Sequence, residues 1–118
     1  MKTRKELKDA YKQMKFRMGI FQIRNTSNGK IMLGSSSDLR AAWNSQRLQL
    51  ELGSHPNKAL QREWKQFGPG HFVYEILEEI EQPEGEPFDP RRELKALLAL
   101  YLESKQPFGD TGYHPAPR

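Results

Sequence analysis

Two periods of hydrophobic residues run along the chain, and together they predict the order of its helices and strands. Apolar residues recur every three or four positions, the spacing of one helix face, in four segments: 2–15, 39–52, 58–67 and 90–105. β-Branched and aromatic residues dominate three shorter segments: 18–25, 30–34 and 71–80. This order predicts an α/β (α+β) fold, a small three-stranded antiparallel sheet flanked by helices.

Residues that start and stop helices stand at the ends of these segments. Asp38 and Asn57 are placed to cap the second and third predicted helices, because their short side chains accept hydrogen bonds from the first turn. Asp89 followed by Pro90 is a typical start for the last helix, and Gly53 is a typical stop for the second. The cap positions therefore agree with the hydrophobic period.

Each predicted helix has apolar residues that we assign to its buried side. For the second helix these are Leu39, Ala42, Trp43, Leu48 and Leu50, and for the last helix Leu94, Leu97, Leu98, Tyr101 and Leu102. Trp43 and Trp64 share their sides with leucines. We therefore expect both rings in the core, and not as platforms on which bases stack.

The net charge of +4 is unevenly distributed. Residues 1–17 carry seven Lys and Arg against two acids, and residues 18–74 carry seven against three. Residues 75–93 reverse this balance with two against eight. The basic first half favours a polyanionic partner, although such charges are equally typical of solvated helix faces.

The chain has no cysteine, which excludes disulfides, thiolate zinc sites and cysteine nucleophiles. No apolar run approaches the ~20 residues that a membrane-spanning helix needs, and the basic start lacks the apolar run of a secretory signal. We therefore expect a cytoplasmic protein with no membrane partner. Its 118 residues fit one domain, which we divide into a basic N-terminal helix (1–17), the main body (18–114) and a tail (115–118).

Two short motifs stand on the two strands of the predicted hairpin. The letters GIF at 19–21 precede MLG at 32–34, and Asn-Gly at 28–29 favours a two-residue turn between them. This arrangement resembles the GIY-YIG nuclease family, in its homing-endonuclease branch. Further segments are similar to the family in order: 35–43, 53–57, 60–62, 64–68, 72–79, Pro107 and 112–113. The resemblance covers 18–114 and implies that family's fold, with an added N-terminal helix.

The resemblance implies a divalent-metal-dependent DNA endonuclease, but the matching positions lack its catalytic groups. The family uses two tyrosines, an arginine that neutralises the phosphate, and a glutamate that holds the metal ion. Here these positions read Phe21, Met32, Ala42 and Leu98. None of these side chains supplies a hydroxyl, a cation or a carboxylate. We therefore predict a degenerate active site, with Phe21, Met32 and Leu98 forming an apolar patch.

Three residues are possible substitutes for the lost groups. Arg47 lies one turn beyond Trp43, and His55 stands where similar family members carry a histidine. Glu93 lies five residues before Leu98, within reach of a register shift in the last helix. If these residues act, cleavage needs Mg²⁺ or Mn²⁺ with Glu93 as the ligand; otherwise we expect neither a metal nor another cofactor.

Polar and basic residues on the hairpin and the next two helices are candidates for contact with nucleic acid, DNA more than RNA. They are Lys30, Ser35, Arg40, Arg47, His55, Asn57, Lys58, Arg62 and Lys65. Three functions stay open: a binding module that no longer cleaves, a divergent endonuclease, and a protein-interaction or self-associating domain. The last would use the acidic stretch 75–86 and the apolar patch.

Overall fold

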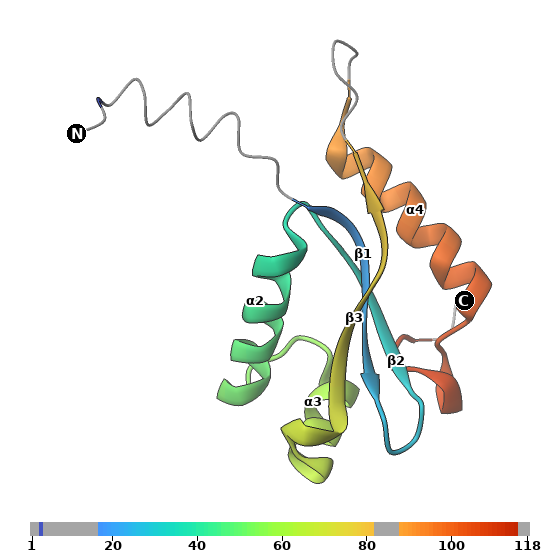
Figure 1. Cartoon of the computed structure of the whole chain (residues 1–118). Helices are drawn as coiled ribbons and strands as arrows, with labels where there is room; N and C mark the ends of the chain where they lie inside the picture. The colour runs from blue at the N-terminus through green and yellow to red at the C-terminus, as the bar shows by residue number, and fades with distance from the viewer. Residues whose placement is uncertain (1–2, 4–16, 82–87, 116–118) are drawn as a thin grey trace.

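The computed structural model describes residue 3, residues 17–81 and residues 88–115 (Figure 1). The helices and strands are β1 Met18–Asn25, β2 Ile31–Ser36, α2 Leu39–Leu52, α3 Lys58–Phe67, β3 Phe72–Ile80 and α4 Pro90–Lys105. All the elements predicted over these residues are confirmed, with small shifts at the ends of β2 and β3. The helix predicted over 2–15 lies outside the described residues except for Thr3, as does most of the basic N-terminal segment 1–17.

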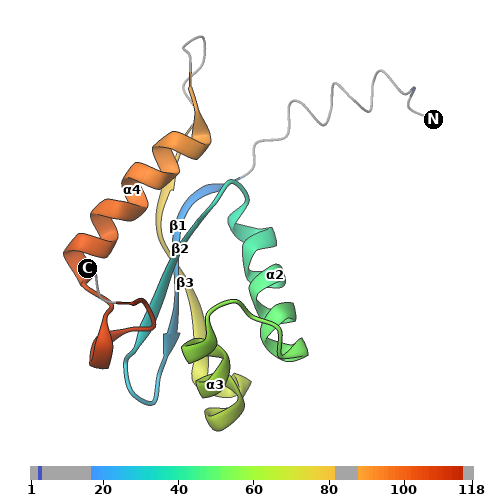
Figure 2. The same ribbon diagram turned by 180° about the vertical axis from the view of Figure 1, so that it is seen from behind.

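The three strands form one antiparallel sheet with the order β2-β1-β3. Figure 2 shows the three strands side by side. On the central strand β1, Phe21 pairs with Gly34 of β2 and with Ile76 of β3. The pairing with β3 shifts its register between Ile20 and Phe21, which leaves Leu77 without an opposite residue. The predicted three-stranded antiparallel sheet is therefore confirmed.

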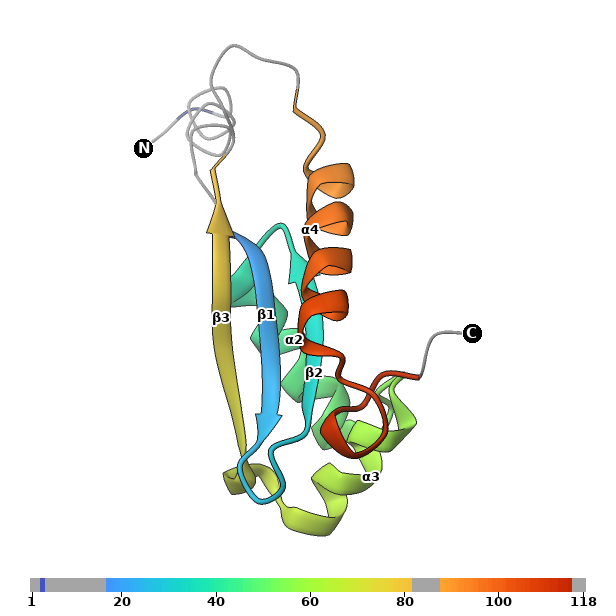
Figure 3. The ribbon, with the colours of Figure 1, turned by 90° about the vertical axis from the view of Figure 1, so that its right-hand side faces the viewer.

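Different helices cover the two faces of the sheet (Figures 1 and 3). Ile20 and Phe21 are neighbours on β1, so their side chains point to opposite faces. Glu78 pairs with Ile20 and accepts a hydrogen bond from the Tyr101 hydroxyl of α4 at 2.7 Å. The face of Ile20 is therefore the α4 face. The main core lies on the other face, under α2 and α3: Phe21, Ile23, Met32, Leu39, Leu50, Leu60, Trp64, Phe72 and Tyr113.

The predicted caps are present at the helix ends. The Asp38 side chain accepts from the Ala41 amide at 3.2 Å, and the Asn57 side chain accepts from the Leu60 amide at 3.0 Å. Gly53 ends α2 with a φ of 77°, a conformation that favours glycine. Each side-chain cap is worth about 1 kcal/mol. No helix in the described residues is long and apolar enough to cross a membrane.

One expectation about α2 is wrong. Leu48 was expected on the buried side, but it is 56% exposed, whereas Leu50 is 1% exposed. Two residues span about 200° of a helix turn, so Leu48 and Leu50 point to opposite sides. Trp64 is buried as predicted, and the half-buried Trp43 stacks on Tyr74 with ring centroids 5.2 Å apart.

Candidate functional site

The four positions that the resemblance assigns to catalysis do not share one surface. Phe21 and Met32 are buried in the core under α2 and α3, and Ala42 packs against that core. Leu98 lies on α4, which covers the opposite face of the sheet (Figure 3). The predicted apolar patch of Phe21, Met32 and Leu98 is therefore wrong, because Phe21 and Met32 point into the core under α2 and α3, whereas Leu98 lies on α4 over the other face.

The end of the Phe21 ring lies against the glycine of the second motif. A Cβ atom at Gly34 would be 2.4 Å from Cζ of Phe21, so only glycine leaves room for the ring. The same ring packs on Tyr74 with centroids 5.2 Å apart. The Tyr74 hydroxyl donates to the Leu39 carbonyl at 2.6 Å, and burial raises the pKa of Tyr74 to about 12. Tyr74 is therefore neutral and its hydroxyl is held by the Leu39 carbonyl, so it does not replace the phenol that is missing at Phe21.

His55 is a structural residue at the junction of α2 and α3. Its Nδ1 accepts from the Asn57 amide at 3.0 Å, which leaves Nε2 to donate to the Gln46 side chain. Its own amide donates to Gln61 at 3.1 Å. His55 is fully buried, and this burial lowers its pKa. Because both ring nitrogens are engaged, His55 is not placed to act as a general base.

The other two possible substitutes also lie apart. Arg47 on α2 forms a 3.9 Å ion pair with Glu51, and its guanidinium lies 6.0 Å from the Trp43 ring centroid. Glu93 is exposed in the first turn of α4, on the far side of the sheet from α2. The structure therefore does not bring Glu93 together with Arg47 and His55.

Glu63 is a partly buried acceptor that the sequence pattern did not reveal. Its carboxylate accepts from Asn25 at 3.2 Å, from Asn28 at 2.5 Å and from the Tyr113 hydroxyl at 3.1 Å, and it lies 3.4 Å from Lys30 Nζ. Burial opposes ionisation, but the hydrogen bonds and the Lys30 charge outweigh it and hold the pKa of Glu63 below its usual value. These contacts fasten the β1–β2 hairpin to α3.

Five of the nine candidates for nucleic-acid contact are not free side chains on the surface of α2 and α3. They form ion pairs, are held inside the fold, or lie on the other face of the sheet. Lys30 is paired with Glu63, Arg47 with Glu51, and His55 is buried. Asn57 caps α3 and donates to the Tyr113 carbonyl at 3.0 Å. Ser35 lies apart from the other eight, on the α4 face.

The remaining cations include a stripe on α3. Lys58, Arg62 and Lys65 are all exposed and follow each other at four and three residues, so they share one side of the helix. The buried apolar residues of α3, Leu60 and Trp64, lie on its other side, and the buried Gln61 lies at the flank of the three basic residues. Within the described part of the chain none of the three basic residues forms an ion pair. We call Lys58, Arg62 and Lys65 the α3 basic stripe.

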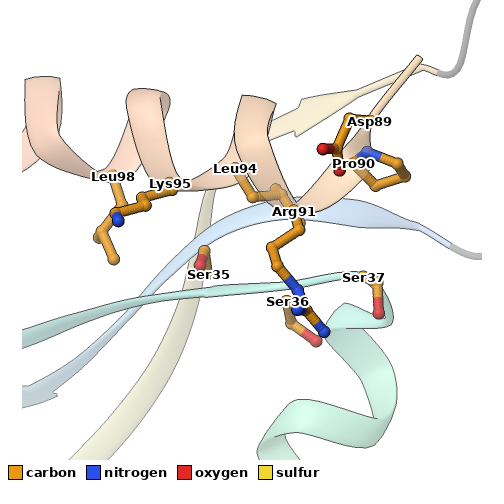
Figure 4. A pocket seen from close by; sticks show the side chains of 9 residues that line it. All are labelled: Ser35, Ser36, Ser37, Asp89, Pro90, Arg91, Leu94, Lys95 and Leu98. Atoms are coloured by element: carbon orange, nitrogen blue, oxygen red, sulfur yellow. The ribbon is translucent and has the colours of Figure 1, made fainter. Parts of the chain in front are cut away.

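A hollow of about 640 Å³ opens on the other face, between the end of β2 and the first turns of α4 (Figure 4). We call it the β2–α4 hollow. Its lining residues are Ser35, Ser36, Ser37, Asp89, Pro90, Arg91, Leu94, Lys95 and Leu98. It therefore contains Leu98, the position at which the resemblance places a metal ligand.

Comparisons with known sequences and solved structures find relatives of this chain. No protein-family model matches the chain. Intron-associated endonuclease 1 of Enterobacteria phage T4 is 34% identical over 102 residues, which are 82% of this chain and 41% of that protein. The catalytic domain of the homing endonuclease I-TevI matches with a TM-score of 0.69 and 30% identity, over 85% of this chain and 99% of that domain. A mutant of that domain matches with a TM-score of 0.64 and 30% identity, over 75% and 84%.

The chain belongs to the GIY-YIG nuclease family. It covers nearly the whole length of the I-TevI catalytic domain, and its sheet and helices are those that the resemblance implied. It spans only about two fifths of the phage T4 relative, so it matches one region of that longer protein.

Among the described residues, those around the position that the resemblance assigns to the metal ligand do not fit the divalent metal ion that the family implies. Mg²⁺ and Mn²⁺ prefer oxygen ligands, above all carboxylates. Leu98 offers none, and two cations, Arg91 and Lys95, line the same hollow. The part of the chain that the structure describes holds no group of three His, Asp or Glu residues able to bind a metal ion.

The sequence contains a signal for Glu63 but none for the hollow that Arg91 and Lys95 line. Glu63 lies three residues after Leu60 and one before Trp64, so a charged residue interrupts the buried side of α3. A carboxylate on the packed side of a helix requires hydrogen-bond donors, and Asn25 and Asn28 of the hairpin supply them. Arg91 and Lys95 are one helix turn apart, but nothing in the sequence says that the serines at the end of β2 face them.

Proposed function

We propose that this GIY-YIG chain is a nucleic-acid-binding module that has lost phosphodiester cleavage and binds through the α3 basic stripe. The observation that carries the proposal is the contrast between the two sets of residues. The stripe consists of exposed cations without ion pairs among the described residues, whereas Phe21, Met32, Ala42 and Leu98 provide no hydroxyl, cation or carboxylate. DNA is the preferred partner, because the family that this chain belongs to cuts DNA.

The loss of cleavage follows from the chemistry that each position would have to perform. Hydrolysis needs an activated nucleophile and positive charge at the phosphate as negative charge develops there. Removing one pre-organised donor of this kind typically costs about 10² to 10³ in rate. Ala42 and Leu98 remove a cation and a metal ligand, and Phe21 and Met32 remove two hydroxyls. The divergent endonuclease that would use Glu93, Arg47 and His55 is disfavoured, because the three residues do not meet.

Binding has weaker geometric requirements than cleavage. Phosphate contacts need cations within reach of a strand, and long flexible side chains tolerate changes in position. At a rise of about 1.5 Å per residue, the separation of seven positions between Lys58 and Lys65 spans roughly 10 Å of helix. Three cations over that distance match the close spacing of charges along a nucleic-acid strand. The basic composition of residues 1–17 adds to the attraction.

The test is a gel-shift series with labelled duplex DNA at rising salt concentration. The variant Lys58→Ala/Arg62→Ala removes two charges from the stripe, and the control Arg92→Ala/Lys105→Ala removes two exposed charges from α4. We expect the stripe variant to bind about tenfold or more weakly, with a salt slope reduced by about 0.9 for each lost phosphate contact. Equal binding by the two variants, or binding that does not respond to salt, would sink the proposal.

Two further elements of the proposal come from the sequence. We place the protein in the cytoplasm, because a cysteine-free chain suits a reducing compartment. We also retain the division into a basic segment (1–17), a GIY-YIG body (18–114) and a tail (115–118). Limited proteolysis followed by mass spectrometry tests that division, since cleavage inside 18–81 would contradict it.

A further inference from the structure

The β2–α4 hollow carries positive charge that the fold does not use. Arg91 and Lys95 are one turn apart on α4, so both lie on the side that faces the end of β2. Figure 4 shows the Arg91 side chain reaching from α4 toward Ser36 and Ser37. Among the described residues neither Arg91 nor Lys95 takes part in an ion pair.

The carboxylates near the hollow are already engaged. Asp89, the one acid among the lining residues, accepts from the Arg92 amide at 3.3 Å and caps α4. Asp38, which follows the serines, accepts from the Ala41 amide at 3.2 Å and caps α2. Among the described residues that line the hollow, two cations therefore stand against one carboxylate, so these side chains carry a net positive charge.

The serines add hydrogen-bond donors. Ser36 is occupied, because its hydroxyl donates to the Asp38 carbonyl at 2.8 Å and accepts from the Asp38 amide at 2.9 Å. The hydroxyls of Ser35 and Ser37 have no partner within the described residues, so they remain able to donate. A polar wall of hydroxyls thus stands opposite the two cations.

The floor of the hollow is apolar. Leu94 is buried and Leu98 is half-buried, and both line the hollow beneath Arg91 and Lys95. An apolar floor weakens local screening by water, which strengthens an interaction between fixed cations and an anion. The same floor supplies no oxygen atom that would hold a divalent cation.

We propose that the β2–α4 hollow binds a phosphate group, with Arg91 and Lys95 as its counter-charges and Ser35 and Ser37 as donors. The planar fork of an arginine and several donors around one anion are the typical recognition elements for phosphate oxygens. Resting on the proposed function, we assign this phosphate to a nucleic-acid strand. Fixed cations then occupy the region in which the GIY-YIG family places a metal-bound glutamate, so binding needs no divalent ion.

The site differs from the α3 basic stripe in position and in test. The stripe lies on α3, and the hollow is lined by residues of α4. These two helices lie on opposite sides of the sheet (Figure 1). Amide chemical shifts of the ¹⁵N-labelled full chain report on the two regions separately. Inorganic phosphate and duplex DNA can each reach both regions, so the position of the shifted amides decides which region binds: Ser35 and Ser37 report on the hollow, and the amides of α3 report on the stripe.

The decisive variant is Arg91→Ala/Lys95→Ala, and Arg92→Ala/Lys105→Ala is its control on the same helix with the same loss of charge. All four residues are exposed, so we expect the melting temperature of each variant to match the wild type. Inorganic phosphate should shift the amides of Ser35 and Ser37 in the wild type and the control, but not in the hollow variant. The hollow variant should also bind duplex DNA about tenfold more weakly.

Other outcomes separate this site from the proposed function. Equal phosphate shifts in the hollow variant and its control overturn the site. If the phosphate shifts depend on Arg91 and Lys95 but the hollow variant binds DNA as tightly as the wild type, the bound phosphate does not belong to a nucleic-acid strand. That result points to a free phosphate compound. If the wild type binds no DNA, the proposed function fails, while the titration with inorganic phosphate still decides whether the hollow is a phosphate site.

Discussion

Replacing Glu63 by alanine is expected to destabilise the domain by about 3 kcal/mol. The change leaves the side-chain amide of Asn25 and the hydroxyl of Tyr113 without their acceptor, at residues that are 0% and 5% exposed. A buried donor without a partner costs about 1–3 kcal/mol. Asn28 is exposed and Lys30 partly exposed, so both turn toward water and add little. The lost desolvation cost of Glu63, whose side chain is 13% exposed, offsets part of the total.

Two further variants test whether the loss of stability in Glu63→Ala comes from the unpaired donors. Glu63→Gln keeps an acceptor oxygen and removes the charge, so it should cost only about 1 kcal/mol. Glu51→Ala is the matched control, because it breaks an exposed helical ion pair with Arg47 and should change the stability by less than about 0.5 kcal/mol. Urea unfolding followed by fluorescence measures all three. A Glu63→Ala protein as stable as Glu51→Ala would refute the reasoning.

The pH dependence of Glu63 provides an independent check with a definite sign. Its pKa in the folded protein is lower than in the unfolded chain, so its contribution is fully present above the unfolded value of about 4.3. The contribution is lost as the pH falls through the folded pKa. The stability difference between wild type and Glu63→Gln should therefore shrink below about pH 4. A difference that is constant down to pH 3 contradicts the assignment.

Two predictions concern packing, and thermal unfolding tests both. Leu50→Ala should cost about 3 kcal/mol and Leu48→Ala less than about 0.5 kcal/mol, because only Leu50 is buried; equal losses would restore the buried side expected from the sequence. Gly34→Ala should cost about 1–3 kcal/mol, since its Cβ would meet the Phe21 ring at 2.4 Å. A Gly34→Ala variant as stable as the wild type would show that the ring moves freely.

The sequence predicts the elements and their ends because those signals are local. A cap such as Asp38 acts on an amide three residues away, and the β1–β2 turn depends on a few consecutive residues. The error at Leu48 was avoidable by the same local argument, because a residue two positions from Leu50 faces the other side of a helix.

The candidate site was harder to predict because it depends on which helix covers which face. Alternation shows that Met32 and Leu33 point to opposite faces, but not that α4 lies over one and α2 over the other. For the same reason, the sequence does not predict the ion pair between Lys30 and Glu63, which are 33 residues apart along the chain. Cations counted in the sequence are available for phosphate only after such tertiary partners are known.

The most direct test of a binding module without cleavage is one incubation of the full chain with labelled duplex DNA, in Mn²⁺ and in EDTA. The products are read on a native gel and on a denaturing gel. The account predicts a shifted band with intact strands in both conditions, weakening as salt rises. Cut strands that appear with Mn²⁺ and vanish with EDTA would contradict it. They would show that the chain cleaves without the groups absent at Phe21, Met32, Ala42 and Leu98.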